Sequence, residues 1–128
     1  MAKTATFSLE EMKPGYFLAW TITTQCVYTY NITLKAGDTV IFSVNKSNYS
    51  PTFQLISQSS QDYSGGNLVL TITCNDANQE LRSSTPSGSI TDTSAKTVGY
   101  VYSICVEDSS DADYNDLYVN IVGWKKKG

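Results

Sequence analysis

The stretch Cys26-Val27-Tyr28-Thr29-Tyr30-Asn31-Ile32-Thr33-Leu34 shows a period of two in its side chains. One set of alternate positions holds Tyr28, Tyr30, Ile32 and Leu34, and the other set holds Val27, Thr29, Asn31 and Thr33. Because successive side chains of a β-strand point to opposite faces, this alternation predicts a strand over residues 26–34 with one buried face.

Short runs of β-branched and aromatic residues with the same period recur along the chain. The further strands that we expect span residues 4–9, 16–24, 39–44, 52–57, 67–75, 79–83, 98–106 and 117–124. Polar stretches with Gly, Pro or Ser separate them, among them residues 45–51 and 83–94. No window keeps the period of an amphipathic helix. We therefore predict an all-β protein, a single-domain β-sandwich of about nine antiparallel strands that covers residues 1–128.

Composition excludes several classes of function. The 128 residues include 9 basic and 12 acidic side chains and no histidine. Without histidine, Ser-His-Asp and Cys-His catalysis are excluded, and we do not expect an enzyme. Without a basic surface we expect no nucleic acid partner, and without a long apolar run we expect no membrane insertion. The N-terminus lacks the apolar segment of a secretory signal, so we expect a soluble protein that is cytoplasmic or exported by a non-classical route.

The acidic side chains are concentrated in one short segment. Five of the 12 lie within ten positions, namely Glu107, Asp108, Asp111, Asp113 and Asp116. The rest of the chain has 9 basic and 7 acidic residues, a net charge of +2. Carboxylates this close repel one another, so a cation is expected among them. The segment has no Lys or Arg, and the nearest basic residues after it in sequence are Lys125, Lys126 and Lys127.

A divalent cation fits this segment better than a lysine. Calcium prefers about six to eight oxygen ligands, whereas magnesium keeps more water. The segment begins like an EF-hand loop, but Asp116 stands where that loop has Gly and Val122 where it has Glu. Two alternatives are a solvated acidic turn and a carboxylate pair for glycoside hydrolysis. The second is disfavoured because acids on one short loop rarely flank a substrate from two sides.

The segment Glu107-Asp108-Ser109-Ser110-Asp111-Ala112-Asp113-Tyr114-Asn115-Asp116 resembles the loop E-D-G-T-D-N-D-Y-N-D of a known family. That family is the soluble calcium-dependent bacterial lectins that bind fucose and mannose. Its loop precedes a C-terminal strand and a tail with a Trp, as residues 117–122 and Trp124 do here. The resemblance implies a β-sandwich, one or two calcium ions per subunit and direct contact between these ions and sugar hydroxyls.

The resemblance also implies which residues form the site. The implied calcium ligands are Glu107, Asp111, Asp113, Asn115, Asp116, the main-chain carbonyl of Ile22 and the terminal carboxylate of Gly128 from a neighbouring subunit. The implied sugar-binding residues are Thr23, Thr24, Asp108, Asp111, Asp113 and Asp116. The segment after the loop is about two residues longer here than in members of the family. Either the extra length moves the carboxylate of Gly128 out of reach of the neighbouring subunit's second calcium, or the lysines before it form a solubilising tail.

The function that we expect is calcium-dependent binding of fucose- or mannose-type mono- or oligosaccharides. We also expect a homodimer or a higher homo-oligomer, because shallow binding sites gain avidity when several are displayed together. The alternative is a β-sandwich whose calcium is only structural and which acts in assembly or protein interaction. The two hypotheses share the calcium and differ in the sugar.

Overall fold

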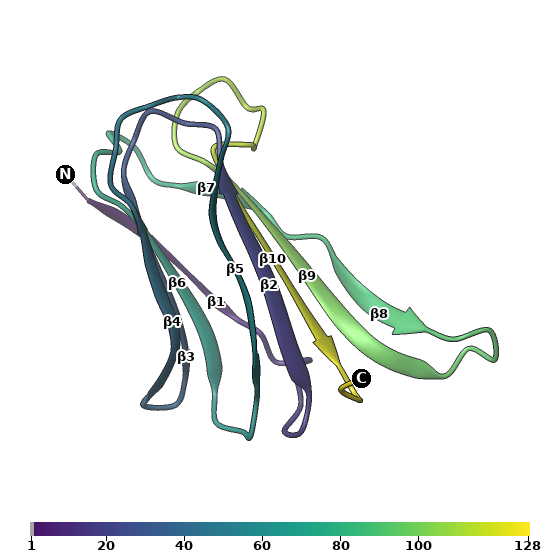
Figure 1. The fold of residues 1–128 in the computed structure, drawn as a ribbon. Helices are drawn as coiled ribbons and strands as arrows, with labels where there is room; N and C mark the ends of the chain where they lie inside the picture. The colour runs from purple at the N-terminus through teal and green to yellow at the C-terminus, as the bar shows by residue number, and fades with distance from the viewer. Residues whose placement is uncertain (1) are drawn as a thin grey trace.

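Two antiparallel β-sheets form the protein, which a computed structural model describes over residues 2–128. One sheet has four strands in the order β1 (Lys3–Ser8), β6 (Leu68–Cys74), β3 (Tyr30–Ala36) and β4 (Thr39–Lys46). The other has six: β5 (Gln54–Asp62), β2 (Phe17–Thr24), β10 (Leu117–Trp124) and β9 (Thr97–Glu107) lie side by side, and β7 (Arg82–Ser84) and β8 (Ser87–Thr91) both pair with β9. The sheets face each other as a sandwich (Figure 1). The predicted all-β sandwich is confirmed.

The core lies between the sheets and follows the period of two. On β3 the side chains of Tyr30, Ile32 and Leu34 are fully buried, while Asn31 between them is exposed. The core residues of the neighbouring and facing strands are Leu68, Leu70, Ile72 and Cys74 on β6, Leu18 and Ile22 on β2, and Leu117, Val119 and Ile121 on β10. Each such large apolar side chain contributes about 1.5–3 kcal/mol by leaving water.

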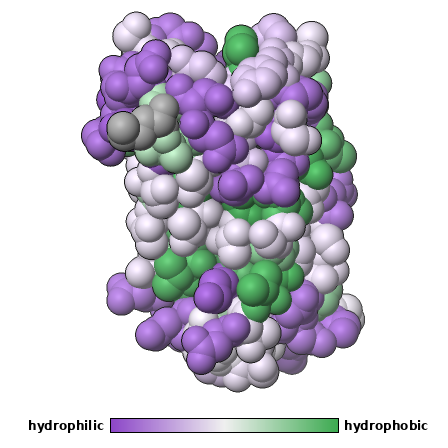
Figure 2. All heavy atoms as spheres, turned by 90° about the vertical axis from the view of Figure 1, so that its left-hand side faces the viewer, coloured by the Kyte–Doolittle hydropathy of each residue, from purple (hydrophilic) through white to green (hydrophobic). Residues whose placement is uncertain are grey.

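The outer face of the four-stranded sheet has a different character. Figure 2 shows that hydrophilic residues gather at its two ends and that only separate hydrophobic patches lie between them. Thr4 and Thr73 of adjacent strands share a hydrogen bond of 3.0 Å there, and Thr33 and Ser43 share one of 3.1 Å. Among residues 2–128 no helix has the length and apolar character needed to cross a membrane.

Several boundaries differ from the sequence prediction. The strand predicted from residue 26 starts at Tyr30, because residues 26–28 bend and the backbone N–H of Thr29 donates to Asp76 Oδ2 at 2.9 Å instead of extending a ladder. The strand predicted for residues 52–57 continues to Asp62, since its polar residues lie on an exposed sheet edge. Residues 83–94 were expected to separate strands, yet they include β8, so the described chain has ten strands rather than nine.

Candidate metal centre

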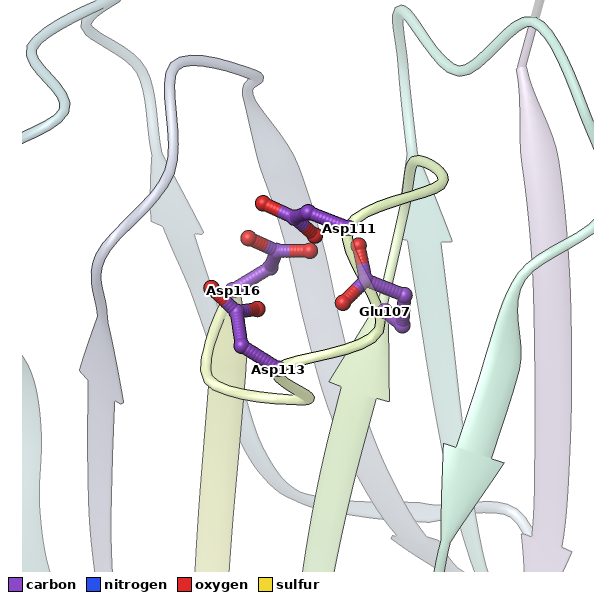
Figure 3. Close-up of side chains that lie close together, drawn as sticks. All are labelled: Glu107, Asp111, Asp113 and Asp116. Carbon is purple, nitrogen blue, oxygen red and sulfur yellow. The ribbon is translucent and has the colours of Figure 1, made fainter.

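The acidic loop joins β9 to β10 at one end of the sandwich, and the C-terminus lies at the other end (Figure 1). Glu107 is the last residue of β9, and Asp116 directly precedes β10. The rung between Val106 and Leu117 closes the loop, so both carboxylates stand at its base and are buried. Asp111 and Asp113 are exposed in the loop itself. The four carboxyl groups point toward one another (Figure 3), and one oxygen from each lies within 4.8 Å of the others.

Hydrogen bonds to Glu107 shape this loop. Its Oε2 accepts from the backbone N–H and the hydroxyl of Ser109, each at 3.0 Å, and its Oε1 accepts from the N–H of Tyr114 at 3.0 Å. Ala112 and Tyr114 have φ angles of 59° and 55°, a left-handed conformation that costs a non-glycine residue about 1–2 kcal/mol. The bonds to Glu107 help to hold this costly backbone, which turns the loop back over its own base.

The crowding of carboxylates shows in their pKa values. Burial raises the pKa of Asp116 to about 8, and the nearby groups of Glu107 and Asp108 add to the rise. Burial also opposes ionisation of Glu107, but hydrogen bonds from Asp116 and from the N–H of Tyr114 outweigh it and hold its pKa well below the usual range. A hydrogen bond to Glu107 raises the pKa of Asp111. Without a metal, the raised pKa of Asp116 favours retention of a proton by the cluster.

Basic side chains do not neutralise this cluster. The ion pairs within residues 2–128 are Lys3–Glu80 at 3.4 Å and Lys127–Asp62 at 3.3 Å, and neither involves the loop. The basic residue that contacts the loop is Arg82, which donates to the carbonyl of Ser109 and lies 5.8 Å from the centre of the Tyr114 ring. The chain-end lysines lie at the opposite end of the sandwich instead (Figure 1).

The donor set fits a single calcium ion. Oxygens that bind one calcium at about 2.3–2.6 Å are separated by no more than about 4.6–5.2 Å. The oxygens of Glu107, Asp111, Asp113 and Asp116 lie within 4.8 Å of one another and so meet this limit. Carboxylate oxygens are hard donors, and no ion pair among residues 2–128 involves these four groups. Calcium prefers such oxygen ligands, whereas zinc and copper also take nitrogen and sulfur ligands.

The end of β2 lies beside the start of β10, next to the loop. Thr24 pairs with Leu117, Thr23 with Tyr118 and Ile22 with Val119. The backbone N–H of Gln25 donates to the carbonyl of Asp116 at 3.1 Å. Strand register therefore brings these three predicted residues to the loop, even though about 90 positions separate them in sequence.

The predicted residues differ in their surroundings. The Thr24 hydroxyl is buried and has no hydrogen-bond partner among residues 2–128, whereas Thr23 is half-buried. A bulge in the β2–β5 pair follows Ile22, and Asn115 is half-buried in the loop. Gly128 is not brought to the loop of its own chain, because β10 runs away from the loop for eight residues before the tail begins.

A cleft of about 380 Å³ opens next to the carboxylates. It is lined by Gln25, Cys26, Val27, Tyr28, Pro51, Asp108, Ser109, Asp111 and Asp116. Asp108 is buried and accepts a hydrogen bond of 2.6 Å from the Tyr30 hydroxyl. Burial, reinforced by the charge of Asp108, raises the pKa of Cys26 to about 12, so its thiol stays protonated. The sequence did not indicate that Tyr30 and Pro51 belong to this site, because they lie far from the acidic loop in sequence and only the fold brings them to it.

Solved structures share this fold. The C-terminal domain of the lectin BC2L-C from Burkholderia cenocepacia aligns over 100% of both chains with 20% identity and a TM-score of 0.69. The Chromobacterium violaceum lectin CV2L, solved with α-methyl-fucoside, and the high-affinity mannose-binding lectin of Ralstonia solanacearum each align over 96% of both chains, with 19% and 18% identity and TM-scores of 0.63 and 0.62. The chain has the fold of these lectins. The resemblance inferred from the loop is thus confirmed at the level of the fold.

Comparison at the level of sequence gives no further relative. No protein-family model matches the chain, and no curated protein sequence matches it.

Proposed function

We propose that this protein is a calcium-dependent lectin that binds fucose- or mannose-type saccharides at the acidic loop. The observation that carries the proposal is the convergence of four carboxylates, two of them buried, beside an open cleft. The shared fold with lectins of which one was solved with α-methyl-fucoside supports it. These structural neighbours are all lectins, which supports a role in binding rather than in catalysis.

Glu107, Asp111, Asp113 and Asp116 would hold one calcium ion, together with the main-chain carbonyl of Ile22. A second ion would involve Asp113, Asn115 and Asp116, and the carboxylate of Gly128 from another copy of the chain would complete its ligands. This last contribution requires a homodimer or a higher oligomer, because Gly128 lies far from the loop of its own chain.

Calcium in this site would supply positive charge and open coordination positions for neutral hydroxyl oxygens. The protein residues around it orient the sugar. Asp108 is an acceptor for a hydroxyl proton at the cleft wall, and its carboxylate is held in place by the Tyr30 hydroxyl. Thr23, at the end of β2, presents a half-buried hydroxyl next to the loop, and Thr24 has a hydroxyl whose hydrogen-bonding capacity is unused.

The test compares calcium-loaded with EDTA-treated protein. Methyl α-fucoside and methyl α-mannoside are titrated into each by calorimetry, and thermal melts are recorded in parallel. We expect binding heat only with calcium, and a higher melting temperature because an ion at about 100 times its dissociation constant adds about 2.7 kcal/mol to folding. A calcium-dependent melt without sugar heat would refute the lectin and favour the structural-calcium alternative. A melt that does not respond to calcium would refute both.

A further inference from the structure

Two exposed apolar side chains line the cleft, and two more are exposed at the start of β5. This apolar rim consists of Val27, Pro51, Phe53 and Leu55. Phe53 is 64% exposed, Leu55 55% and Val27 48%. Val27 and Pro51 line the same cleft as Asp108 and Asp116. The apolar rim therefore adjoins the candidate calcium and sugar site through Val27 and Pro51.

Strand pairing places the rest of the apolar rim beside Thr23. Leu55 on β5 lies directly opposite Thr23 on β2, and opposite residues in an antiparallel pair project from the same face. Phe53 lies directly before β5, two positions from Leu55, and is also exposed. Gln54 between them turns the other way and is half-buried. Leu55 thus stands next to a residue implied in sugar binding, and Phe53 is its exposed neighbour in sequence.

A buried lysine fixes the two loops that carry the apolar rim. Lys46 is 1% exposed, and its ammonium group donates to the carbonyls of Val27 at 3.4 Å, Tyr28 at 2.9 Å and Asn48 at 2.6 Å. Asn48 and Gln54 exchange amide hydrogen bonds of 3.0 and 2.9 Å across the base of the β4–β5 loop. Because these contacts order the loops without a ligand, binding there costs little additional entropy.

We propose that the apolar rim is a subsite for a second sugar ring attached to the saccharide that the carboxylate cluster holds; this rests on the proposed function. A pyranose ring has C–H groups on its faces and hydroxyls around its edge, so a neutral apolar wall binds the face. The rim carries no charge, and the cleft volume of about 380 Å³ falls within the range of about 300–1,000 Å³ usual for small-molecule sites. Four side chains are far fewer than the about 20–30 residues per side of a stable protein interface.

The experiment measures affinities for three ligands that share the first ring. Calcium-loaded protein is titrated with methyl α-mannoside, with 4-nitrophenyl α-mannoside and with an α-linked mannobiose. The test variant combines Phe53→Ser with Leu55→Ser. The control is Val40→Ser, because Val40 is 52% exposed on β4, and about 20 Å of strand separates it from Lys46 at the cleft end.

We expect the unaltered protein to bind the aryl glycoside and the disaccharide about 3- to 10-fold more tightly than methyl α-mannoside, the range of one aromatic contact. The double variant should lose this preference and keep its affinity for methyl α-mannoside and calcium, and Val40→Ser should behave like the unaltered protein. Equal affinities for all three ligands, or a preference that survives in the double variant, would overturn the subsite alone. Absence of binding to every saccharide would overturn the proposed function as well. A change in the sedimentation of the double variant would show a contact between copies and also overturn the subsite.

Discussion

Calcium and a proton should compete for the carboxylate of Asp116. In the metal-free protein, burial and the neighbouring acids raise the pKa of this group to about 8, so most molecules keep the proton at neutral pH. A calcium ligand must be deprotonated, and binding therefore releases the proton. We expect the apparent calcium affinity to rise with pH and to level off above the pKa of Asp116.

The magnitude follows from that pKa. About one molecule in a hundred has Asp116 ionised at pH 6, and about half have it ionised at pH 8, so the affinity should fall about 50-fold on going from pH 8 to pH 6. This factor corresponds to about 2.3 kcal/mol. It is large enough to be measured by direct titration.

The stability of the metal-free protein should show the opposite trend. The pKa of Asp116 in the folded state lies above its usual value of 3.8. Its contribution to stability is thus full below about pH 4 and is lost as the pH rises toward 8. Since the calcium-bound state needs the ionised group, the rise in melting temperature on adding calcium should grow from pH 6 to pH 8.

Calorimetry at pH 6, 7 and 8, in buffers with different ionisation enthalpies, measures both affinity and the number of protons released. About one proton per calcium is expected at pH 6, falling to about half at pH 8. Asp38→Asn, at an exposed turn, is the control for the loss of one acidic charge and should keep the full pH dependence. An affinity that stays constant between pH 6 and 8, with no proton released, would show that Asp116 is not a calcium ligand.

Two further predictions concern individual side chains. Asp113→Ala should abolish the effect of calcium on the melting temperature, because Asp113 is implied in both ion sites. Asp108→Asn should keep calcium binding and weaken only saccharide binding, since its amide oxygen still accepts a hydrogen bond from Tyr30. Equal loss of calcium binding in both variants, measured by titration, would contradict these roles. Lys46→Met should lower the free energy of unfolding in urea by about 2–3 kcal/mol, because it removes the buried ammonium group from which three carbonyls accept hydrogen bonds. A loss below about 0.5 kcal/mol would contradict this reasoning, because it would mean that water replaces the ammonium group as the donor to those carbonyls.

Local sequence patterns were sufficient for most of the fold and for the acidic loop. Alternation identified the faces of β3 and β6 because each has one side in the core. The loop was visible because its acids are close together in sequence. It was also bounded by two predicted strands, residues 98–106 and 117–124, which the structure pairs with Val106 opposite Leu117.

The surroundings of the site depend on contacts that no local pattern reports. Arg82 reaches the loop because β7 pairs with β9 and sets Arg82 opposite Glu107. Lys46 looks like an ordinary polar residue at a strand end, yet it is buried among carbonyls from two loops. The short strand β8 was missed because Ser87, Gly88 and Ser89 match a turn as well as an edge strand.

The four carboxylates divide into a pair set by the sheet and a pair carried by the loop. Glu107 and Asp116 are buried at the ends of β9 and β10, so strand register determines their separation. Asp111 and Asp113 are exposed, and their positions depend on the left-handed residues Ala112 and Tyr114. In the metal-free state the proton on Asp116 removes one charge from the buried pair, where repulsion would cost most. This lowers the repulsion between the two buried carboxylates when no cation is bound, and the exposed pair remains available to bind one.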